Sequence, residues 1–440
     1  MANPDLQAKQ NDVSNPDDNQ AELNIPRGKA YFWTFVICLA MILDMIDRTA
    51  VNAILPLLKK EFALSDAQAG FVGSVVGISM AVLVFPVAIL CDQWSRRKMM
   101  SFMVGFWSLA TYGTGMAQNY THLILARLSV GTGEAGYAAP AFSLLSAWYP
   151  KNKRGLVLGV FNAAKPLGAA AGVAIAGYLA YEFGWRTMFG ILAAPGILIA
   201  IMFWFIPDYK VKKGASDQTE KVPLKESILY LLRTKTILIV LLGGASVFIF
   251  ENTFMIWGAT YYARTFGMNV KEAGAVVGLI GLVACIGAPV FGALGDKLLK
   301  RSPKGRIYTA MTLAVFMFIL MTAALKSGDF RTTAILWTAA MFILPGLQIN
   351  VYAVTQDLVP PYLRGMSVSL VPIFNHLCFG VWAPMVAGRL SDLYGLPYAL
   401  QMLAIASLVL CEIFFYLSLR YYMTDLSRVK ALGTFKLGKG

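Results

Sequence analysis

The sequence predicts an all-α membrane protein, with twelve transmembrane helices arranged as two parallel repeats of six. Three observations support this prediction. Of the 440 residues, 57% are hydrophobic and only 14% are charged, and the mean hydropathy is +0.60. Soluble domains of this length are not so apolar throughout. The apolar residues form twelve runs long enough to cross a bilayer, and a short charged motif occurs once in each half.

The twelve predicted spans follow one another with short polar connections, except at 207–235, a longer polar stretch that separates six spans from six. Most of them reach the roughly 20 residues that a helix needs to cross the hydrocarbon core. Glycine and proline inside them are normal for packed membrane helices. In order, the predicted spans are 30–56, 68–91, 99–117, 121–148, 156–182, 186–206, 236–262, 271–295, 306–325, 332–357, 365–388 and 398–420.

An internal repeat supports the division into two halves. The motif AxxxD followed by RR at 88–97 recurs as GxxxD followed by KR at 292–301, an offset of 204 residues. The same offset carries Asp47 of the first span onto Glu251, an acid in the middle of the seventh. Parallel repeats of six spans, with a site between them at mid-membrane, are typical of secondary transporters.

Lysine and arginine are distributed unevenly over the predicted loops. With the N-terminus taken as cytoplasmic, 27 of the 38 fall on the cytoplasmic side, 8 on the opposite side and 3 within spans. This is the positive-inside pattern of a multi-pass protein of the cell inner or plasma membrane with both termini inside. The net charge of +14 therefore reports topology, and no nucleic-acid partner is predicted. The predicted parts are a disordered cytoplasmic tail (1–27), a first six-helix bundle (28–206), a cytoplasmic linker (207–235), a second six-helix bundle (236–422) and a cytoplasmic tail (423–440).

The sequence contains no motif for catalysis or for a cofactor. All five cysteines lie in predicted spans, far apart and without CxxC spacing, so disulfides and a metal site are not expected. Neither a Walker motif nor an HExxH motif nor a Cys/His cluster occurs, so ATP hydrolysis and metal chemistry are not indicated. We therefore predict no cofactor, no metal and no enzymatic activity.

Three charged residues lie inside the first predicted span. Asp44, Asp47 and Arg48 are three and four residues apart, so they share one face of a helix. A charge at the bilayer centre costs a few kcal/mol or more, and such residues usually line a water-filled pathway. The alternative is a structural ion pair between Asp44 and Arg48. Asp47 has no such partner in its own helix turn.

The fourth span carries Arg127 and Glu134, which are seven residues apart and therefore face the same way, about 10 Å apart along a helix axis. Glu134 falls near mid-span, where an unpaired carboxylate tends to be protonated. A proton carrier needs this property. We predict that Asp47 and Glu134 carry the coupling proton; the alternative is a static pair between Arg127 and a carboxylate.

The fifth span contains a lysine beside a proline. Pro166 lacks an amide hydrogen and clashes with the carbonyl of Asn162, which loosens the helix there. Lys165, at this loosened turn, is a candidate anchor for a substrate anion. It could equally be a counter-ion for Glu134 or Asp47, and the two roles are compatible.

The second half offers mostly neutral polar and aromatic groups. For any one of them, a buried hydrogen bond between helices is an alternative to ligand contact, although His376 could also titrate near neutral pH. The predicted charge network and anion site comprises Asp44, Arg48, Arg127 and Lys165, and the predicted substrate cavity comprises Tyr137, Asn162, Glu251, Asn252, Gln348, Asn350, Tyr352, Asn375 and His376.

The repeated charged motif predicts a mechanical role at the cytoplasmic ends of the helices. Asp92 and Asp296 each precede basic residues, which are Arg96, Arg97 and Arg301. Charge-assisted hydrogen bonds between these groups would latch the two halves together on the cytoplasmic side. We therefore predict a cytoplasmic gate at these five residues.

The repeated motif, the six-plus-six layout and the linker resemble the major facilitator superfamily over residues 28–422. Three stretches are similar both to spinster-like lysolipid transporters and to the anion:cation symporters of organic and sugar acids: Asp47-Arg48, Arg127 with Gly133-Glu134-Ala135, and Gly184-Trp185-Arg186. Four further stretches favour the spinster-like branch: LSDAQAG at 64–70, APGI at 194–197, VPPYLR at 359–364 and LSD at 390–392.

This resemblance implies functional residues. The proton-linked acids of the spinster-like family map to Asp47 and Glu134, and its first-span arginine maps to Arg48. The chain also departs from the superfamily pattern. The first motif has Ala88, Gln93 and Ser95 where Gly, a basic residue and Gly are usual, and the fifth span has Val173 where the antiporter motif has Pro.

The sequence therefore predicts a monomeric, proton-coupled secondary transporter that works by symport or antiport. It would move an anionic, amphipathic, lysolipid-like solute across the bilayer by rocker-switch alternating access. The alternative is a proton symporter of a small organic or sugar acid. A non-transporting membrane sensor on the same fold would need a sizeable soluble signalling domain, which we do not expect beyond the short tails.

Overall fold

The structure, a computed structural model, describes residues 25–93, 95–208, 224–360 and 363–437. The described residues form helices joined by short turns, and none of them forms a strand. Every predicted span coincides with one helix or with consecutive helical segments, which confirms the all-α membrane fold class. Of the predicted tail 1–27, the structure describes residues 25–27, and of the predicted linker 207–235 it describes 207–208 and 224–235, which include a short helix.

The first six spans are built from seven helices. They are α2 (Arg27–Phe62), α3 (Asp66–Gln93), α4 (Arg96–Gly115), α5 (Tyr120–Glu134) with α6 (Ala138–Trp148), α7 (Lys151–Phe183) and α8 (Trp185–Phe203). A short helix, α9 (Leu224–Arg233), precedes the second half.

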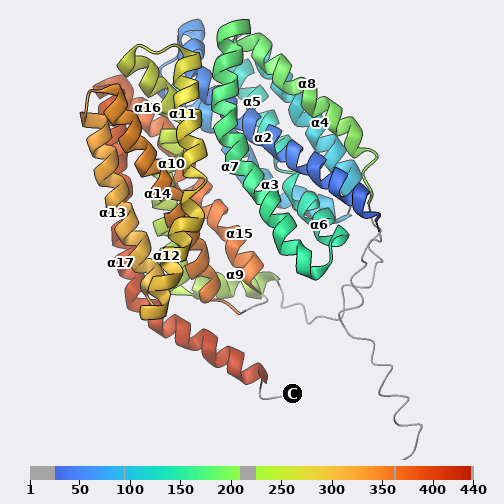
Figure 1. The fold of residues 1–440 in the computed structure, drawn as a ribbon, viewed down its shortest axis with the longest axis vertical. Helices are drawn as coiled ribbons and strands as arrows, with labels where there is room; N and C mark the ends of the chain where they lie inside the picture. The colour runs from blue at the N-terminus through green and yellow to red at the C-terminus, as the bar shows by residue number, and fades with distance from the viewer. Residues whose placement is uncertain (1–24, 94, 209–223, 361–362, 438–440) are drawn as a thin grey trace, which may run out of the picture.

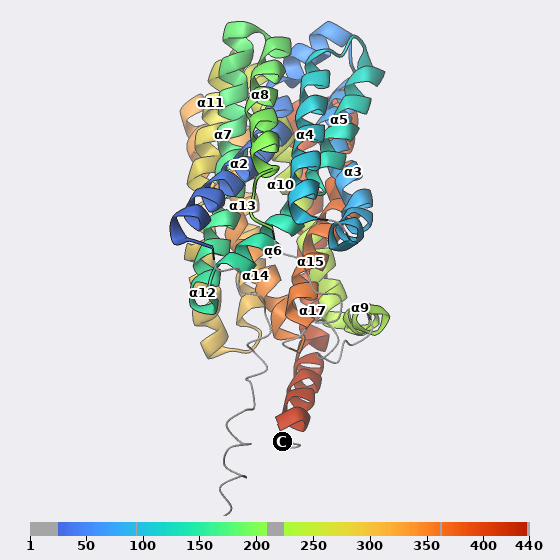
Figure 2. The same cartoon turned by 90° about the vertical axis from the view of Figure 1, so that its right-hand side faces the viewer.

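The second six spans follow the same order. They are α10 (Lys235–Phe266), α11 (Val270–Ala284) with α12 (Gly287–Arg301), α13 (Gly305–Lys326), α14 (Phe330–Asp357), α15 (Arg364–Phe374) with the π-helix η3 (Asn375–Gly380) and α16 (Trp382–Tyr394), and α17 (Leu396–Leu437). In Figures 1 and 2, α17 continues beyond the bundle, through most of the predicted tail 423–440. Ten helical segments of the described chain are long and apolar enough to cross a membrane.

Local sequence sets many of the helix ends. The side chains of Ser95, Asn119 and Asp329 accept a hydrogen bond from a backbone N–H of the first turn that follows. Asn269 forms a capping box with Glu272 at the start of α11. These caps satisfy amide groups that the helix itself cannot pair.

The fourth predicted span, 121–148, is broken in the structure. α5 ends at Glu134, and tighter turns carry the chain to α6, with the N–H of Gly136 donating to the carbonyl of Gly133 at 3.2 Å. The local sequence is rich in glycine, which favours helix poorly. Glu134 therefore lies at the end of a helical segment, whereas the sequence suggested the middle of a continuous helix.

The two halves meet at the end of the molecule opposite the described chain termini, which we call the closed end. Figure 1 shows α7 beside α11 there, and the two halves separating toward the other end, the termini end. Glycines allow this contact, because a Cβ on Gly177 would lie 2.4 Å from the carbonyl oxygen of Val270 and one on Gly274 would lie 2.7 Å from that of Val173. Between described residues, the hydrogen bonds and ion pairs that join the halves all lie at the closed end.

Candidate functional site

Charged residues from three helices of the first half lie close together near the middle of the membrane. This first-half charge cluster comprises Asp44, Asp47 and Arg48 of α2, Arg127 and Glu134 of α5, and Lys165 of α7. Nη2 of Arg48 is 3.1 Å from Oε2 of Glu134 and 3.9 Å from Oδ2 of Asp44. Nε of Arg48 also donates to Oε2 of Glu134 at 3.2 Å. The shorter ion pair therefore joins α2 to α5, and the pair within α2 is the longer one.

Arg127 is completely buried, and it forms no ion pair with a carboxylate of the described residues. Its Nη1 donates to the carbonyl oxygen of Asp47 and its Nη2 to that of Arg48, each at 3.2 Å. The fixed fork of the guanidinium group suits two neighbouring acceptors of this kind. The suggested static pair between Arg127 and a carboxylate is therefore wrong for this conformation. Arg127 holds α5 against the backbone of α2.

The three acids of the cluster are buried, with 3–4% of each residue exposed. The hydroxyl of Thr111 donates to Oδ2 of Asp47 at 3.1 Å. One oxygen of each acid, Oδ1 of Asp44, Oδ1 of Asp47 and Oε1 of Glu134, has no hydrogen-bond partner among the described residues. A buried oxygen without a donor is costly, so these three positions can accept a proton or a donor from a ligand.

Lys165 extends the cluster toward α7. Its Nζ is 5.8 Å from the centre of the Phe142 ring, and it interacts electrostatically with Asp44 and Arg48. The sequence suggested Glu134 or Asp47 as its counter-ion, and the structure favours Asp44 instead. Lys165 is half-buried, so it remains accessible to a ligand.

Tight packing of α5 explains why Glu134 reaches Arg48. A Cβ on Gly131 would lie 2.5 Å from the carbonyl oxygen of Val76 in α3, and one on Gly133 would lie 2.8 Å from the amide nitrogen of Trp107 in α4. Only glycine permits such close backbones at these two positions. The last turn of α5 is thereby held in place beside α2.

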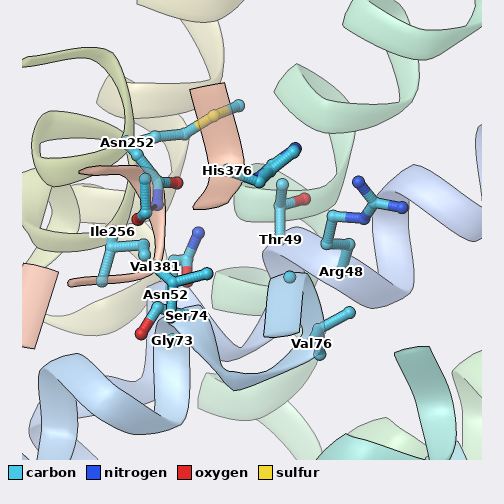
Figure 3. A pocket seen from close by; sticks show the side chains of 13 residues that line it. Arg48, Thr49, Asn52, Gly73, Ser74, Val76, Asn252, Ile256, His376 and Val381 are labelled. Carbon is cyan, nitrogen blue, oxygen red and sulfur yellow. Dashed lines mark hydrogen bonds between the residues drawn. The ribbon is translucent and has the colours of Figure 1, made fainter. Parts of the chain in front are cut away.

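A pocket of about 60 Å³ lies between the two halves, next to Arg48. Figure 3 shows side chains of α2 and α3 facing those of α10 and of the segment that follows α15. The lining residues are Arg48, Thr49, Asn52, Gly73, Ser74, Val76 and Gly77 of the first half and Asn252, Met255, Ile256, His376, Gly380 and Val381 of the second. A water needs roughly 10–15 Å³ by this measure, so the pocket can hold a few waters or a small polar group.

The second half contributes an acid of its own near this pocket. Nε2 of Gln348 donates to Oε2 of Glu251 at 3.2 Å, and Tyr352 interacts electrostatically with Glu251. The next residue, Asn252, lines the pocket and donates to the carbonyl of Gly380. His376, which was also predicted for the cavity, lines the same pocket. The structure therefore brings together five of the residues predicted for the cavity.

Comparison with known proteins identifies the family. The sequence pattern described as "Major Facilitator Superfamily" matches residues 37–383. The chain belongs to the major facilitator superfamily. It is therefore a multi-pass membrane transporter and not an enzyme.

The curated relatives of this transporter fall into more than one branch. It is 26% identical to an MFS-type efflux pump of Mycolicibacterium smegmatis (86% of this chain, 87% of that one). It is 24% identical to a hexuronate transporter of Bacillus subtilis (81% and 87%) and 24% identical to protein spinster homolog 1 of Bos taurus (89% and 78%). Among solved structures, a bacterial homologue of the human lysosomal transporter spinster, inward-facing and unoccupied, matches with a TM-score of 0.83 at 22% identity, over 91% of this chain and 99% of that one.

Among the described residues, the polar contact between the halves with the most hydrogen bonds is at the closed end, and the sequence did not predict it. Asp66 is buried, and its two oxygens accept from both terminal nitrogens of Arg264 at 2.7 Å each. Lys59 at 2.5 Å and the hydroxyl of Ser391 at 2.6 Å also reach Asp66, and Asp392 accepts from the N–H of Asp66 at 2.8 Å. We call these five residues the closed-end latch. The only signal was the repeated LSD at 64–66 and 390–392, which served solely as a family marker.

Replacing Asp66 with asparagine should open the closed end. The change leaves Arg264 and Lys59 without a carboxylate, and a hydrogen bond to a charged group is worth about 1.5–3 kcal/mol. Since 1.4 kcal/mol is a factor of ten, we expect at least a roughly tenfold shift toward conformations open at this end. Spin labels at the exposed positions Lys60 and Tyr394, on a background without native cysteines, would measure the distance distribution.

The matched control is Asp329→Asn at the start of α14. Asp329 accepts from the N–H and the hydroxyl of Thr332 within its own helix turn, so its loss should leave the distance distribution unchanged. An unchanged distribution in Asp66→Asn itself would show that apolar packing alone keeps this end closed.

At the termini end, the predicted gate residues make contacts within their own halves. Asp296 pairs with Arg306 at 2.7 Å, and Arg306 also contacts Asp357. Arg301, another predicted gate residue, is exposed in this conformation. Arg306 reaches Asp296 because it lies in the first turn of α13, directly after the turn that follows α12.

In the first half, Nε of Arg96 donates to the hydroxyl of Ser143 at 3.0 Å, and the backbone N–H of Arg97 donates to Asp208 at 3.3 Å. The side chain of Asp92 lies outside the described residues. The predicted latch between halves concerns a conformation closed at this end, and it stays a prediction.

Two residues predicted for the cavity lie in the packed interior. Tyr137 is 1% exposed, donates to the carbonyl of Ile37 and stacks on Phe203. Asn350 is 2% exposed and donates to the carbonyls of Phe291 and Gly346. In this conformation their polar groups are paired inside one half, and their place in the substrate cavity stays a prediction.

The remaining two are placed differently. Asn162 is exposed on α7 and donates to the carbonyl of Leu158, on the helix face that carries Ala170 and Gly177 toward α11 at the closed end. Asn375 begins the π-helix, and its Oδ1 is buried without a partner among the described residues.

Proposed function

We propose that this transporter moves an anionic, amphipathic organic solute and couples that movement to protons. The observation that carries the proposal is the first-half charge cluster, which places Arg48 in contact with Glu134 and at the wall of a pocket shared by both halves. A membrane protein keeps charges at this depth at considerable cost, and such groups usually serve transport.

Asp47 and Glu134 are the proposed proton-carrying pair. When Glu134 is ionised, its carboxylate forms an ion pair with the guanidinium group of Arg48. A proton on Glu134 removes that attraction and frees Arg48 for an anionic group of the substrate. Competition between a proton and an anion for the same partners couples the two movements, because each occupant changes the affinity for the other.

The substrate's anionic group would meet Arg48 and Lys165, and its apolar body would lie against the second half. That side of the pocket offers Met255, Ile256 and Val381. The likeness to the spinster homologue in fold, and to a spinster homologue in sequence, agrees with a lipid-like substrate. The hexuronate and galactarate/D-glucarate transporters among the relatives keep a small sugar acid as the second candidate.

The topology completes the proposal. The excess of Lys and Arg on the termini side argues that both termini are cytoplasmic. The closed-end latch then shuts the outer side, and this conformation faces inward. The bundles 28–206 and 236–422 would rock about the site as a monomer, with Asp92, Arg96, Arg97, Asp296 and Arg301 closing the cytoplasmic side in the opposite state.

A chain-length series tests the substrate class. Each buried methylene contributes about 0.8 kcal/mol, so every two methylenes should tighten binding of a lysophosphatidylglycerol roughly tenfold. Binding would be measured with purified protein across the series, beside gluconate and lactate. A flat series together with a clear response to gluconate would assign the chain to the sugar-acid branch.

Proton coupling would be tested separately, by driving flux of the bound probe into phosphatidylcholine vesicles with a pH gradient.

A further inference from the structure

We infer that Glu251 is a second proton-binding site of this transporter, located in the second half at the position that Asp47 occupies in the first. The inference rests on the proposed proton coupling and extends it, because a second site changes the number of protons moved in each cycle. Its support comes from the internal repeat, the hydrogen bonds of the two acids, the charges around Glu251, and the burial of Glu251 and Gln348.

The repeat relates the two acids and their neighbours. The offset of 204 residues carries Asp47 onto Glu251 and Arg48 onto Asn252. Arg48 and Asn252 both line the pocket between the halves. The same offset carries Asn52 onto Ile256, and these two also line it. Each half therefore presents the same helix face to the pocket, and in each half an acid directly precedes the first lining residue.

The hydrogen bonding of the two acids is also alike. Asp47 accepts from the neutral hydroxyl of Thr111 at 3.1 Å, and Glu251 accepts from the neutral amide of Gln348 at 3.2 Å. In both cases the donor comes from another helix of the same half. Among described residues, neither acid forms an ion pair with a cation.

The surroundings of Glu251 contain little charge. Tyr352 of α14 interacts with it electrostatically. None of the other titratable groups on the helices packed against α10 is paired with it in the part of the chain that the structure describes. Near mid-membrane these groups are Asp44, Asp47 and Arg48 of α2, His376 and Cys378 of η3, and Cys411 and Glu412 of α17. An ionised carboxylate in such a place is strongly unfavourable unless it is paired. Asp66, which is paired with two cations, shows how this chain holds an acid that has to stay ionised.

Two further features make Glu251 suitable for reversible proton binding. It is only partly buried, and the next residue, Asn252, lines the pocket between the halves, which offers a short path for a proton. Oε1 of Gln348 is buried without a partner among the described residues, although Nε2 of the same side chain contacts Glu251. This oxygen can accept a hydrogen bond from a donor at that place. A protonated Glu251 is such a donor. Closing of the halves around the pocket would then change the access of this proton together with that of the proton on Asp47 and Glu134.

The experiment measures the coupling ratio in phosphatidylcholine vesicles. The probe is labelled lysophosphatidylglycerol, at a fixed concentration gradient and with the membrane potential clamped at zero. The pH gradient that just stops net flux depends inversely on the number of coupled protons. If Glu251 and the first-half pair each carry one proton, this gradient doubles in Glu251→Gln. An unchanged gradient would overturn the inference.

Glu412→Gln is the matched control. Glu412 is another partly buried acid of the second half, and its Oε1 has no hydrogen-bond partner among the described residues. It does not line the pocket, so its loss should leave the gradient unchanged. A doubling in this variant as well would mean that any second-half acid changes the coupling, and it would count against Glu251.

A second measurement separates this inference from the proposed function. Infrared difference spectra of the full chain between acid and alkaline buffer need no substrate and report protonated carboxyl groups directly. A carboxyl band lost in Glu251→Gln supports the site even if the probe is not transported. If a pH gradient fails to drive the probe in the unmodified protein, the proposed function fails. If the gradient drives it but Glu251→Gln changes neither the ratio nor the band, only the second site fails.

Discussion

Glu134→Gln is expected to abolish transport driven by a pH gradient while leaving the protein folded in the membrane. Glutamine has the shape of a protonated glutamate, so Arg48 permanently loses its closest anionic partner, whose Oε2 lies 3.1 Å away. The carboxyl group can no longer alternate between a proton and the guanidinium group. Without substrate, Arg48 then lacks this anionic partner, so the empty transporter cannot return through the closed state, and a proton at Glu251 does not replace that partner. Flux should fall to that of protein-free vesicles. Exchange of labelled for unlabelled probe should persist, because it requires no net proton movement.

The measurement is pH-driven uptake in vesicles of matched protein content, with Glu412→Gln as the control that loses a membrane-embedded acid outside the cluster. Asp47→Asn should reduce driven uptake as well, since Asp47 is the other member of the proposed pair. Undiminished driven uptake in both Asp47→Asn and Glu134→Gln would falsify the proposed proton pathway.

Arg127→Met should destabilise the folded protein more than any other single change in the cluster. Arg127 is completely buried and donates to the carbonyl oxygens of Asp47 and Arg48. Methionine has a similar length but leaves the two carbonyl oxygens without a donor and removes the positive charge that acts on Asp47 through space. Each hydrogen bond to a charged group is worth about 1.5–3 kcal/mol, so thermal unfolding should occur at a markedly lower temperature.

Two further variants identify the cause of this loss. Arg127→Lys keeps the charge but cannot donate to both carbonyls at once, so it should recover only part of the stability. Adding Asp47→Asn to Arg127→Met removes the uncompensated acid, and the double variant should be more stable than the sum of the two single changes predicts. Strict additivity would indicate that Arg127 acts through the two carbonyls alone.

The bilayer constrains which residues a crossing helix can contain, and this constraint made the fold class and the span positions predictable from the sequence. A bilayer requires about 20 apolar residues for each crossing helix, and hydropathy reads this directly from the chain. Charges inside such runs are rare, so Asp44, Asp47, Arg48, Arg127, Glu134 and Lys165 could be selected as one set before their positions were known. The repeat likewise linked Asp47 to Glu251 through its offset alone.

The tertiary structure decided which charged group meets which. The sequence placed Arg127 and Glu134 on one helix face. In the structure, the break after Glu134 and the packing of α5 allow Glu134 to form an ion pair with Arg48, whereas Arg127 donates to backbone carbonyls. Helix packing also brings Asp296 into an ion pair with Arg306, and it brings Asp66 into an ion pair with Arg264 across the two halves. The physical reason is that hydropathy and helix periodicity act along one helix, whereas the distance between side chains of different helices depends on how closely and at what angle those helices pack.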